Sequence, residues 1–350
     1  MDSEVLIEVK QLSRHYYGNN RSSALGNKHS DTGENHSIAV DNISFTLQRG
    51  EVLGFLGPNG AGKSTTMQML TGNLAPTHGS IKIAGMDLID SPIEAKAKIG
   101  YLPDTPPLYK DLSVDEYLIY CAQLNRVPKA AIASAVAMTK ERCGLTEHGK
   151  RVINNLSKGY QQRVGIAQAI IHSPDIVILD EPTVGLDPIQ MVEIRKLIKE
   201  LGQSHSVMIS SHILPEIQNI CNNVQIINQG KLVLNASIEQ LNQHMQTQTL
   251  HISCTHSVDT QKIAALKGIT DIRQDDKSLT LQCTVKEDKT EENQAAIIHT
   301  AQQVIELANR EQWGLYEIFS EKQSLEDVFM SLTDPRLQHE QEQEQEQNID

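Results

Sequence analysis

Short apolar runs recur along the chain and are separated by polar or glycine-containing segments. Runs of this kind predict strands over residues 5–9, 40–47, 51–56, 80–84, 98–102, 175–179 and 207–209. Between the last two runs the spacing becomes helical, with Pro188 in the first turn, Gly202 at the end, and one apolar face formed by Ile194, Leu197, Ile198 and Leu201. Strands that alternate with helices predict an α/β domain with a mainly parallel sheet, and we place it over residues 4–238.

Two further regions differ from this pattern. Residues 105–160 are rich in helix formers, with an apolar face at Tyr117, Leu118 and Cys121, and predict a helical subdomain inserted into the α/β domain. After about residue 240 the sequence pattern changes and predicts a separate set of strands and helices. The expected strands are 250–254, 278–285 and 315–319, and the expected helices are 295–309 and 325–332. We interpret residues 245–334 as a small C-terminal α+β domain.

Two segments contain too few apolar residues to form a core. Residues 19–37 have only Ala24 and Leu25 as apolar side chains, so we expect a mobile insertion there. Residues 336–350 contain the repeat EQEQEQEQ, which predicts a disordered acidic tail.

The composition of the 350 residues excludes several classes of protein. Lys and Arg total 31 against 44 Asp and Glu, a net charge of −13, so no nucleic-acid partner is expected. The five cysteines are scattered without CxxC spacing, which predicts a reduced intracellular chain with no zinc site. The chain shows neither a signal-peptide pattern nor an apolar run of the ~20 residues that a membrane helix needs. Work at a membrane would therefore need a partner.

A glycine-rich motif follows the strand at 51–56 and precedes a predicted helix. It fits GxxxxGK[ST], and its residues are Gly57, Pro58, Asn59, Gly60, Ala61, Gly62, Lys63 and Ser64, followed by Thr65. The glycines let backbone N–H groups close around phosphate oxygens at the positive end of the helix. Lys63 would reach the β- and γ-phosphates, and Ser64 would offer a hydroxyl to Mg²⁺.

Two acidic residues end the apolar strand at 175–179. Asp180 is placed to hold Mg²⁺ through water, and Glu181 could polarise an attacking water. An apolar strand that ends in two acids is a weak signal by itself, and the preceding phosphate loop makes it a strong one.

A second candidate phosphate-binding helix start lies in LSKGYQQR, residues 156–163. One nucleotide does not need two such ends from one subunit, whereas two subunits arranged head to tail would use both. Taken alone, the segment could also be an ordinary helix start.

Together these motifs resemble the ATP-binding subunit of an ATP-binding-cassette (ABC) transporter. GPNGAGKST is similar to the family's Walker A motif, LSKGYQQR to its signature, and IVILDEP to its Walker B motif. Residues 184–187 (VGLD) resemble the D-loop, and 210–212 (SSH) resemble the switch histidine. The resemblance covers residues 4–235 and implies a P-loop NTPase fold with an inserted helical subdomain.

The resemblance also implies roles for individual residues. Tyr17 matches the aromatic residue that stacks on adenine, although Tyr16 is an equal neighbour. Ser157 and Gly159 would contact the γ-phosphate bound to the opposite subunit. Glu181 would be the catalytic base and His212 would hold the γ-phosphate and the water. Asp187 would carry contacts between the two sites.

The sequence departs from the general family pattern at two positions. Lys158 stands where the signature often has glycine. Asp104, in YLPD, stands where most cassettes carry the Q-loop glutamine; it could approach Mg²⁺ through water but cannot donate a hydrogen bond to a partner. A carboxylate after GYLP and the segment 324–333 (SLEDVFMSLT) are similar to an export-type subfamily that includes drug-, sodium- and gliding-associated transporters.

The resulting hypothesis is a cytoplasmic ATPase, peripheral at the inner face of the cell membrane. As a homodimer or paired cassette it would bind ATP and Mg²⁺ and drive a separate integral membrane permease in export. The alternative is a soluble ABC ATPase that acts in translation or DNA repair. An importer ATPase and a nucleotide-binding regulator without turnover are less consistent with the motifs.

Overall fold

The computed structural model describes residues 4–17, 36–244, 249–266, 268–275, 278–283 and 290–321. The chain divides into two compact units, Met1–Ile238 and Glu239–Asp350. The helix predicted at 325–332, the tail 336–350 and residues 19–35 of the expected insertion lie outside the described residues.

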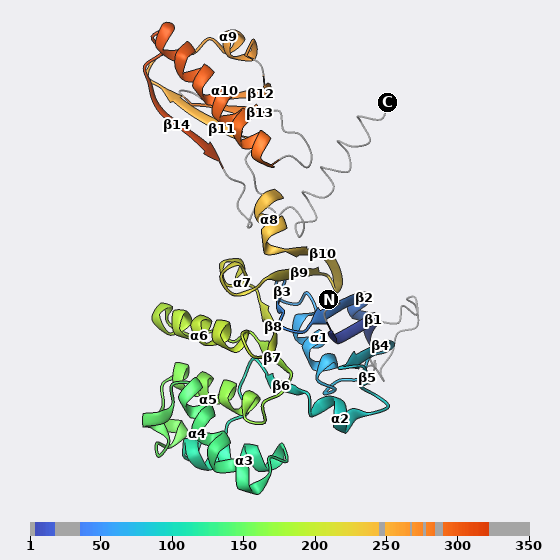
Figure 1. Cartoon of the computed structure of the whole chain (residues 1–350). Coiled ribbons are helices and arrows are strands. Elements are labelled where there is room, and N and C mark those ends of the chain that lie inside the picture. The colour runs from blue at the N-terminus through green and yellow to red at the C-terminus, as the bar shows by residue number, and fades with distance from the viewer. Residues whose placement is uncertain are drawn as a thin grey trace, which may run out of the picture. The chain divides into compact units, whose positions relative to one another are not determined.

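The first unit is built on a six-stranded sheet with the order β10-β9-β3-β8-β7-β6 (Figure 1). Its strands are β3 (Val52–Leu56), β6 (Ile99–Leu102), β7 (Ile176–Asp180), β8 (Ser206–Ser211), β9 (Asn223–Asn228) and β10 (Lys231–Ser237). All neighbours are parallel except β9 and β10. Every residue of β3, β7 and β8 is buried, which explains their continuous apolar character.

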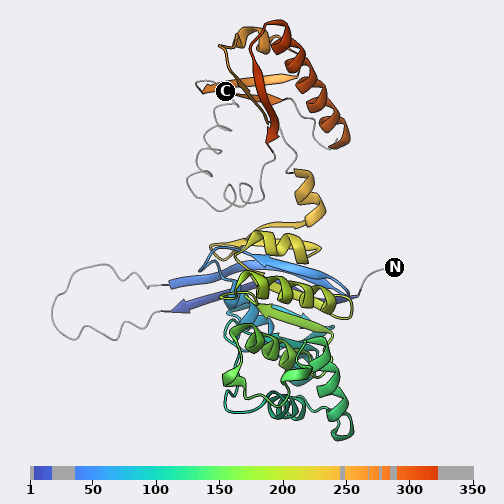
Figure 2. The same cartoon turned by 90° about the vertical axis from the view of Figure 1, so that its left-hand side faces the viewer.

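A second sheet in this unit is antiparallel, with the order β2-β1-β4-β5. Its strands are β1 (Val5–Tyr17), β2 (His36–Gln48), β4 (His78–Ile83) and β5 (Met86–Asp87). Figure 2 shows β1 and β2 as long blue strands that lie side by side. Tyr17 of β1 pairs with His36 of β2, and Tyr16 pairs with Ser37. Strand β2 therefore includes the last two residues of the expected insertion 19–37, which corrects the boundary of that insertion.

Helices lie between the strands of the first unit. They are α1 (Lys63–Leu70), α2 (Pro92–Lys96), α3 (Val114–Leu124), α4 (Ile132–Arg142), α5 (Lys158–Ile170), α6 (Pro188–Leu201) and α7 (Leu214–Ile220). Helix α8 (Ile238–His244) follows the last strand, β10. Between β6 and β7, helices α3, α4 and α5 form the green helical region of Figure 1. Ser113 and Glu116 form a reciprocal capping box that starts α3.

The parallel arrangement explains where chemistry can occur. The carboxyl ends of parallel strands meet at one sheet edge, and ligands bind there in open α/β sheets. Strands β3, β7 and β8 end at Leu56, Asp180 and Ser211. The segments that follow them therefore bring together the glycine-rich loop, Glu181 and His212.

The second unit has a four-stranded antiparallel sheet with the order β12-β13-β11-β14. Its elements are β11 (Thr249–Cys254), α9 (Thr260–Ala264), β12 (Ile269–Asp275), β13 (Ser278–Cys283), α10 (Thr290–Arg310) and β14 (Leu315–Glu321). This βαββαβ order is that of the ferredoxin-like fold. Its own core includes Leu250, Ile252, Leu281, Val304 and Trp313.

All five cysteines are free and buried. Burial raises the pKa of the Cys121 thiol to about 11 and that of Cys143 to about 12. Burial also raises the pKa of Cys221, Cys254 and Cys283 above the usual thiol value. The thiols are therefore protonated at neutral pH.

Candidate nucleotide-binding site

The glycine-rich loop between β3 and α1 adopts a conformation that only small residues allow. Gly60 and Gly62 have φ angles of 82° and 110°, in the left-handed region. A side chain at Gly62 would place its Cβ 2.4 Å from the carbonyl oxygen of Ala39, and one at Gly57 would place it 2.4 Å from that of Ile227. The loop is thus closely enclosed by β2 and β9.

Lys63 begins α1 and is 5% exposed. Its ammonium donates to the carbonyl oxygens of Gly57 at 2.8 Å and Pro58 at 3.2 Å. It also lies 3.3 Å from Oε1 of Glu181. The charge is therefore satisfied from within the chain, by groups that surround the phosphate position of such a loop.

Asp180 ends β7 and is 2% exposed. Its Oδ1 accepts a hydrogen bond from Ser210 Oγ at 2.5 Å and another from Ser64 Oγ at 3.4 Å. Ser210 Oγ in turn accepts from the backbone N–H of Glu181 at 2.9 Å. Ser210, which the sequence analysis did not assign, thus holds both acidic residues at the end of the strand.

Burial is the main cause that raises the pKa of the Asp180 carboxyl above its usual value. The hydrogen bonds from Ser210 and Ser64 oppose that shift, and the charges of Glu181 and Asp104 add to it. A positive charge brought near Asp180 would favour its ionised form.

Glu181 faces His212, with its Oε2 2.9 Å from Nδ1 of the imidazole. Its backbone φ of 48° is unusual for a residue other than glycine. Strain of this kind is characteristic of sites where the surrounding structure fixes a side chain in place. A carboxylate beside an imidazole is suited to holding a water and accepting its proton.

Lys63, Ser64, Glu181 and His212 line one cavity of about 410 Å³. Its lining residues are Ala39, Asn59, Gly60, Gly62, Lys63, Ser64, Thr65, Asp104, Glu181, Val184 and His212. Residues 57–65, 104, 180–181 and 212, singled out from separate parts of the sequence, thus belong to one region. Ala61 is buried, and its carbonyl accepts from the backbone N–H of Gly230. Tyr17 ends β1, and its side chain is not among those that the structure describes.

Of the expected signature (156–163) and D-loop (184–187), only Val184 is in that lining. Ser157 is the N-cap of α5 and accepts from the backbone N–H of Tyr160, and Gly159 is buried against Gln190. The Lys158 ammonium lies beside Gly185, where a Cβ would be 2.0 Å away. Asp187 caps α6 by accepting from the N–H of Gln190 at 2.9 Å.

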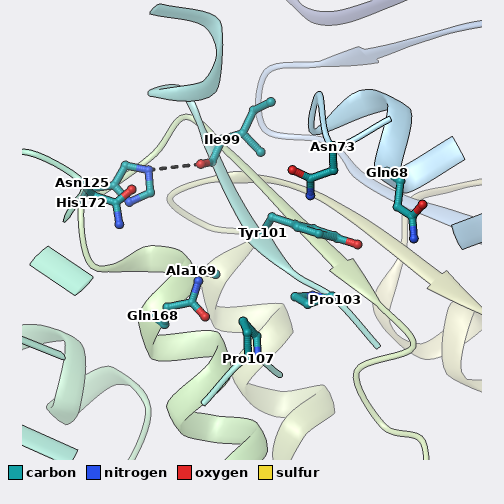
Figure 3. A pocket seen from close by; sticks show the side chains of 10 residues that line it. All are labelled: Gln68, Asn73, Ile99, Tyr101, Pro103, Pro107, Asn125, Gln168, Ala169 and His172. Atoms are coloured by element: carbon teal, nitrogen blue, oxygen red, sulfur yellow. Dashed lines mark hydrogen bonds between the residues drawn. The ribbon is translucent and has the colours of Figure 1, made fainter. Parts of the chain in front are cut away.

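A larger cavity of about 580 Å³ lies elsewhere in the first unit (Figure 3). Most of its polar lining is uncharged, from Gln68, Asn73, Asn125 and Gln168, and the Tyr101 ring faces into it. The His172 ring lies 3.2 Å from the carbonyl oxygen of Ile99, and burial lowers the pKa of this imidazole. No Asp or Glu is among its lining residues, whereas Asp104 and Glu181 line the smaller cavity.

A phosphate loop at the carboxyl edge of a parallel sheet, opposite a buried Asp–Glu pair, defines a P-loop nucleotide hydrolase. Comparison with known proteins places the chain in a narrower class within these hydrolases. The family model described as ABC transporter matches residues 40–184. The ABC transporter ATP-binding protein YxlF of Bacillus subtilis (strain 168) is 35% identical over 224 residues, 64% of this chain and 74% of that protein.

Two further matches agree. The bacitracin transport ATP-binding protein BcrA of Bacillus licheniformis is 40% identical over 197 residues, 56% of this chain and 63% of that protein. The solved cbiO1 of Clostridium perfringens, part of the ABC transporter complex cbiONQ, has a TM-score of 0.57 at 26% identity and covers 68% of this chain and 90% of that chain.

The chain belongs to the family of ABC transporter ATP-binding proteins and is an ATPase of that family. The resemblance drawn from the motifs and the predicted P-loop NTPase fold are confirmed. The described residues contain no helix that is long and apolar enough to cross a membrane.

Proposed function

We propose that this chain powers a separate membrane permease in export. Two cassettes would bind two MgATP head to tail at their interface, close on binding and open after hydrolysis. ATP drives the cycle because it binds the closed dimer more tightly than the open one. The chain would be cytoplasmic and held at the inner face of the membrane by the permease.

One observation supports the head-to-tail arrangement above all. The glycine-rich loop, Glu181 and His212 line one cavity, and Ser157 and Gly159 are not among its lining residues. Ser157 is exposed at the start of the 13-residue helix α5, which has no acidic residue in its first turn. A second cassette could present its α5 to the γ-phosphate held by the first, and the positive helix end would stabilise it.

Within each half-site, the residues have distinct proposed roles. The backbone N–H groups of residues 59–65 surround the phosphates, and Lys63 exchanges Glu181 and the loop carbonyls for β- and γ-phosphate oxygens. Glu181, released from Lys63, orients the attacking water and accepts its proton, while His212 holds the carboxylate and the γ-phosphate. Tyr17 would stack on adenine, and Asp187 would link the two sites.

The donor set also fits Mg²⁺. Ser64 Oγ and Asp180 Oδ1 face each other at 3.4 Å, with Asp104 in the same cavity. The described residues hold no group of three or more His, Cys, Asp or Glu that could bind a metal alone, so the ion would enter with the nucleotide. When bound, Mg²⁺ offsets the phosphate charge.

The permease and the export direction rest on two features. Asp104 follows GYLP as in export-type cassettes, and the relative BcrA is named for bacitracin transport. The cavity of Figure 3 presents amide groups that could hydrogen-bond to a loop of a membrane partner. The motif set and relatives do not favour a soluble role in translation or DNA repair.

Glu181→Gln tests the hydrolytic assignment. The amide keeps the shape but cannot accept the proton, so turnover should fall by more than about 100-fold while ATP binding persists. The variant should accumulate as an ATP-bound dimer, measured by size-exclusion chromatography with light scattering. Parental turnover in this variant would show that Glu181 is not the base.

The partner is tested separately. The tagged full chain is purified from gently solubilised membranes, and the co-purifying proteins are identified by mass spectrometry. A stoichiometric polytopic membrane protein is the expected result. Recovery only with ribosomal or repair proteins in the soluble fraction would contradict the transporter role.

A further inference from the structure

A buried carboxylate outside the nucleotide cavity joins three parts of the chain. Glu216 lies in α7 and is 2% exposed. Its Oε2 accepts from Thr183 Oγ1 at 2.7 Å and from Ser211 Oγ at 3.1 Å. Its Oε1 accepts from Arg195 Nη2 of α6 at 3.0 Å. Arg195 supplies the opposite charge that a buried carboxylate needs.

The two hydroxyl donors lie next to the proposed catalytic pair. Thr183 is in the loop after β7, two residues after Glu181, and Ser211 is the last residue of β8 and immediately precedes His212. Both donors are almost completely buried, with 2% of Thr183 and none of Ser211 exposed. One carboxylate oxygen therefore joins the loop after β7 to the end of β8.

The two residues that bind Glu216 also hydrogen-bond to the backbone near the catalytic pair. Ser211 Oγ also accepts from the N–H of Ile213 at 2.9 Å, which fixes the peptide that follows His212. The carbonyl of Thr183 accepts from the N–H of Leu186, and that of Glu181 accepts from Val184. Glu181 and His212 are themselves joined by a hydrogen bond of 2.9 Å, so the two segments are linked both through Glu216 and directly.

We infer that Glu216 is a positioning residue for ATP hydrolysis, which holds Glu181 and His212 at their working separation through Thr183 and Ser211. The inference rests on the roles proposed above for Glu181 and His212. Glu216 itself is not in the lining of the nucleotide cavity. Its loss should therefore lower kcat and leave the KM for MgATP nearly unchanged.

Glu216→Gln removes the charge and one acceptor while it keeps the shape. If the NH₂ group of Gln at position 216 faces the hydroxyls, it competes with the Ile213 N–H for the oxygen of Ser211. If the NH₂ group faces Arg195 instead, two hydrogen-bond donors face each other. Misplacement of a catalytic pair is costly, so we expect kcat to fall at least about tenfold with KM within about threefold.

Glu193→Gln is the matched control. Glu193 also pairs with an arginine, Arg163, across two helices at 2.8 Å, but it is exposed and lies in α6, outside the loop after β7, the end of β8 and α7. This variant should retain parental kcat. If Glu216→Gln lowers only the melting temperature and its kcat per folded molecule matches the control, Glu216 is structural and the inference is wrong.

A second pair of variants keeps the test decisive should Glu216→Gln fail to fold. Thr183→Val removes the hydroxyl donor with little change of volume, and Thr183→Ser retains it. We expect kcat to fall about fivefold or more in the valine variant and to return close to the parental value in the serine variant. Equal turnover in both variants would overturn the inference.

The proposed roles are tested in parallel with Glu181→Gln and His212→Ala. Parental turnover in these two variants would refute the catalytic pair, and the inference would fall with it. If both variants lose turnover while Glu216→Gln behaves like Glu193→Gln, only the inference about Glu216 is wrong.

Discussion

Individual residues of the phosphate loop differ in how strictly the structure requires them. Gly60 and Gly62 both have positive φ angles, but an added Cβ at Gly60 meets nothing within 4 Å. At Gly62 the same atom meets a backbone oxygen of β2, which cannot rotate away. Conformation constrains both positions, and packing constrains only the second.

This difference predicts an order of stability. Gly60→Ala should cost about 1 kcal/mol of unfolding free energy, from the left-handed backbone alone. Gly62→Ala adds overlap with Ala39 and should cost at least about 3 kcal/mol, with loss of ATP affinity. Chemical denaturation and nucleotide titration of both variants check the order. Equal losses would show that packing against β2 has no effect.

The sequence identifies the residues of this site whose roles depend on local motifs. Lys63 was assigned because it belongs to a glycine-rich motif of fixed spacing. Asp180 and Glu181 were assigned because they end an apolar strand. Ser210 and Glu216 were not assigned, because their roles arise from contacts with residues about 30 positions away. A serine at a strand end or a glutamate on a short helix has no local signature.

Among the elements, buried strands were predicted better than exposed ones. The runs at 51–56 and 175–179 agree with β3 and β7, because buried parallel strands are apolar throughout. Strand β12 was not predicted, since only Ile269 and Ile272 are apolar at this sheet edge. The β9–β10 hairpin was also missed, although its two-residue turn Gln229–Gly230 has the positive φ angles typical of hairpins.

One charged cluster joins the starts of several elements. Asp175 precedes β7 and bonds to Lys98, before β6, and to Arg49, before β3, each at 3.0 Å. The hydrogen bond from Lys98 is the largest cause that lowers the pKa of the Asp175 carboxyl, followed by that from Arg49. A carboxyl with a lowered pKa in the folded state stabilises that state when it is ionised.

Asp175→Asn should therefore destabilise the chain at neutral pH but not in acid. The contribution is complete above the unfolded pKa of about 3.9 and is lost as the pH falls through the lower folded value. Because the partners are half-exposed, the difference at pH 7 should be no more than about 1 kcal/mol. Denaturation curves from pH 7 to pH 3 measure it. A difference that stays constant would exclude the ion pairs as its cause.

For the whole molecule, the main expectation is that the ATP site of a single chain is incomplete and that a second cassette completes it. Ser157→Arg places a long side chain at the exposed start of α5, where the partner's γ-phosphate would dock. ATP binding by single chains should match the parent, while turnover should fall more than about tenfold because closure is blocked. Equal loss of binding would argue against a site completed by a second cassette.

The control for this variant is Ser157→Ala. It removes the hydroxyl that caps α5, at a cost of about 1 kcal/mol, without adding bulk. If it stops hydrolysis as fully as the arginine variant, loss of the Ser157 hydroxyl, at the cap or at the partner's γ-phosphate, and not the added bulk would be responsible.

The buried cysteines make the chain a convenient background for site-specific labelling. With all five thiols protonated and out of solvent, mild alkylating dyes should leave the folded protein unmarked. A single cysteine introduced in place of the exposed Lys196 would then be the reactive one, with no native cysteine removed. A spin label or fluorophore there could follow two cassettes as they approach and separate during turnover.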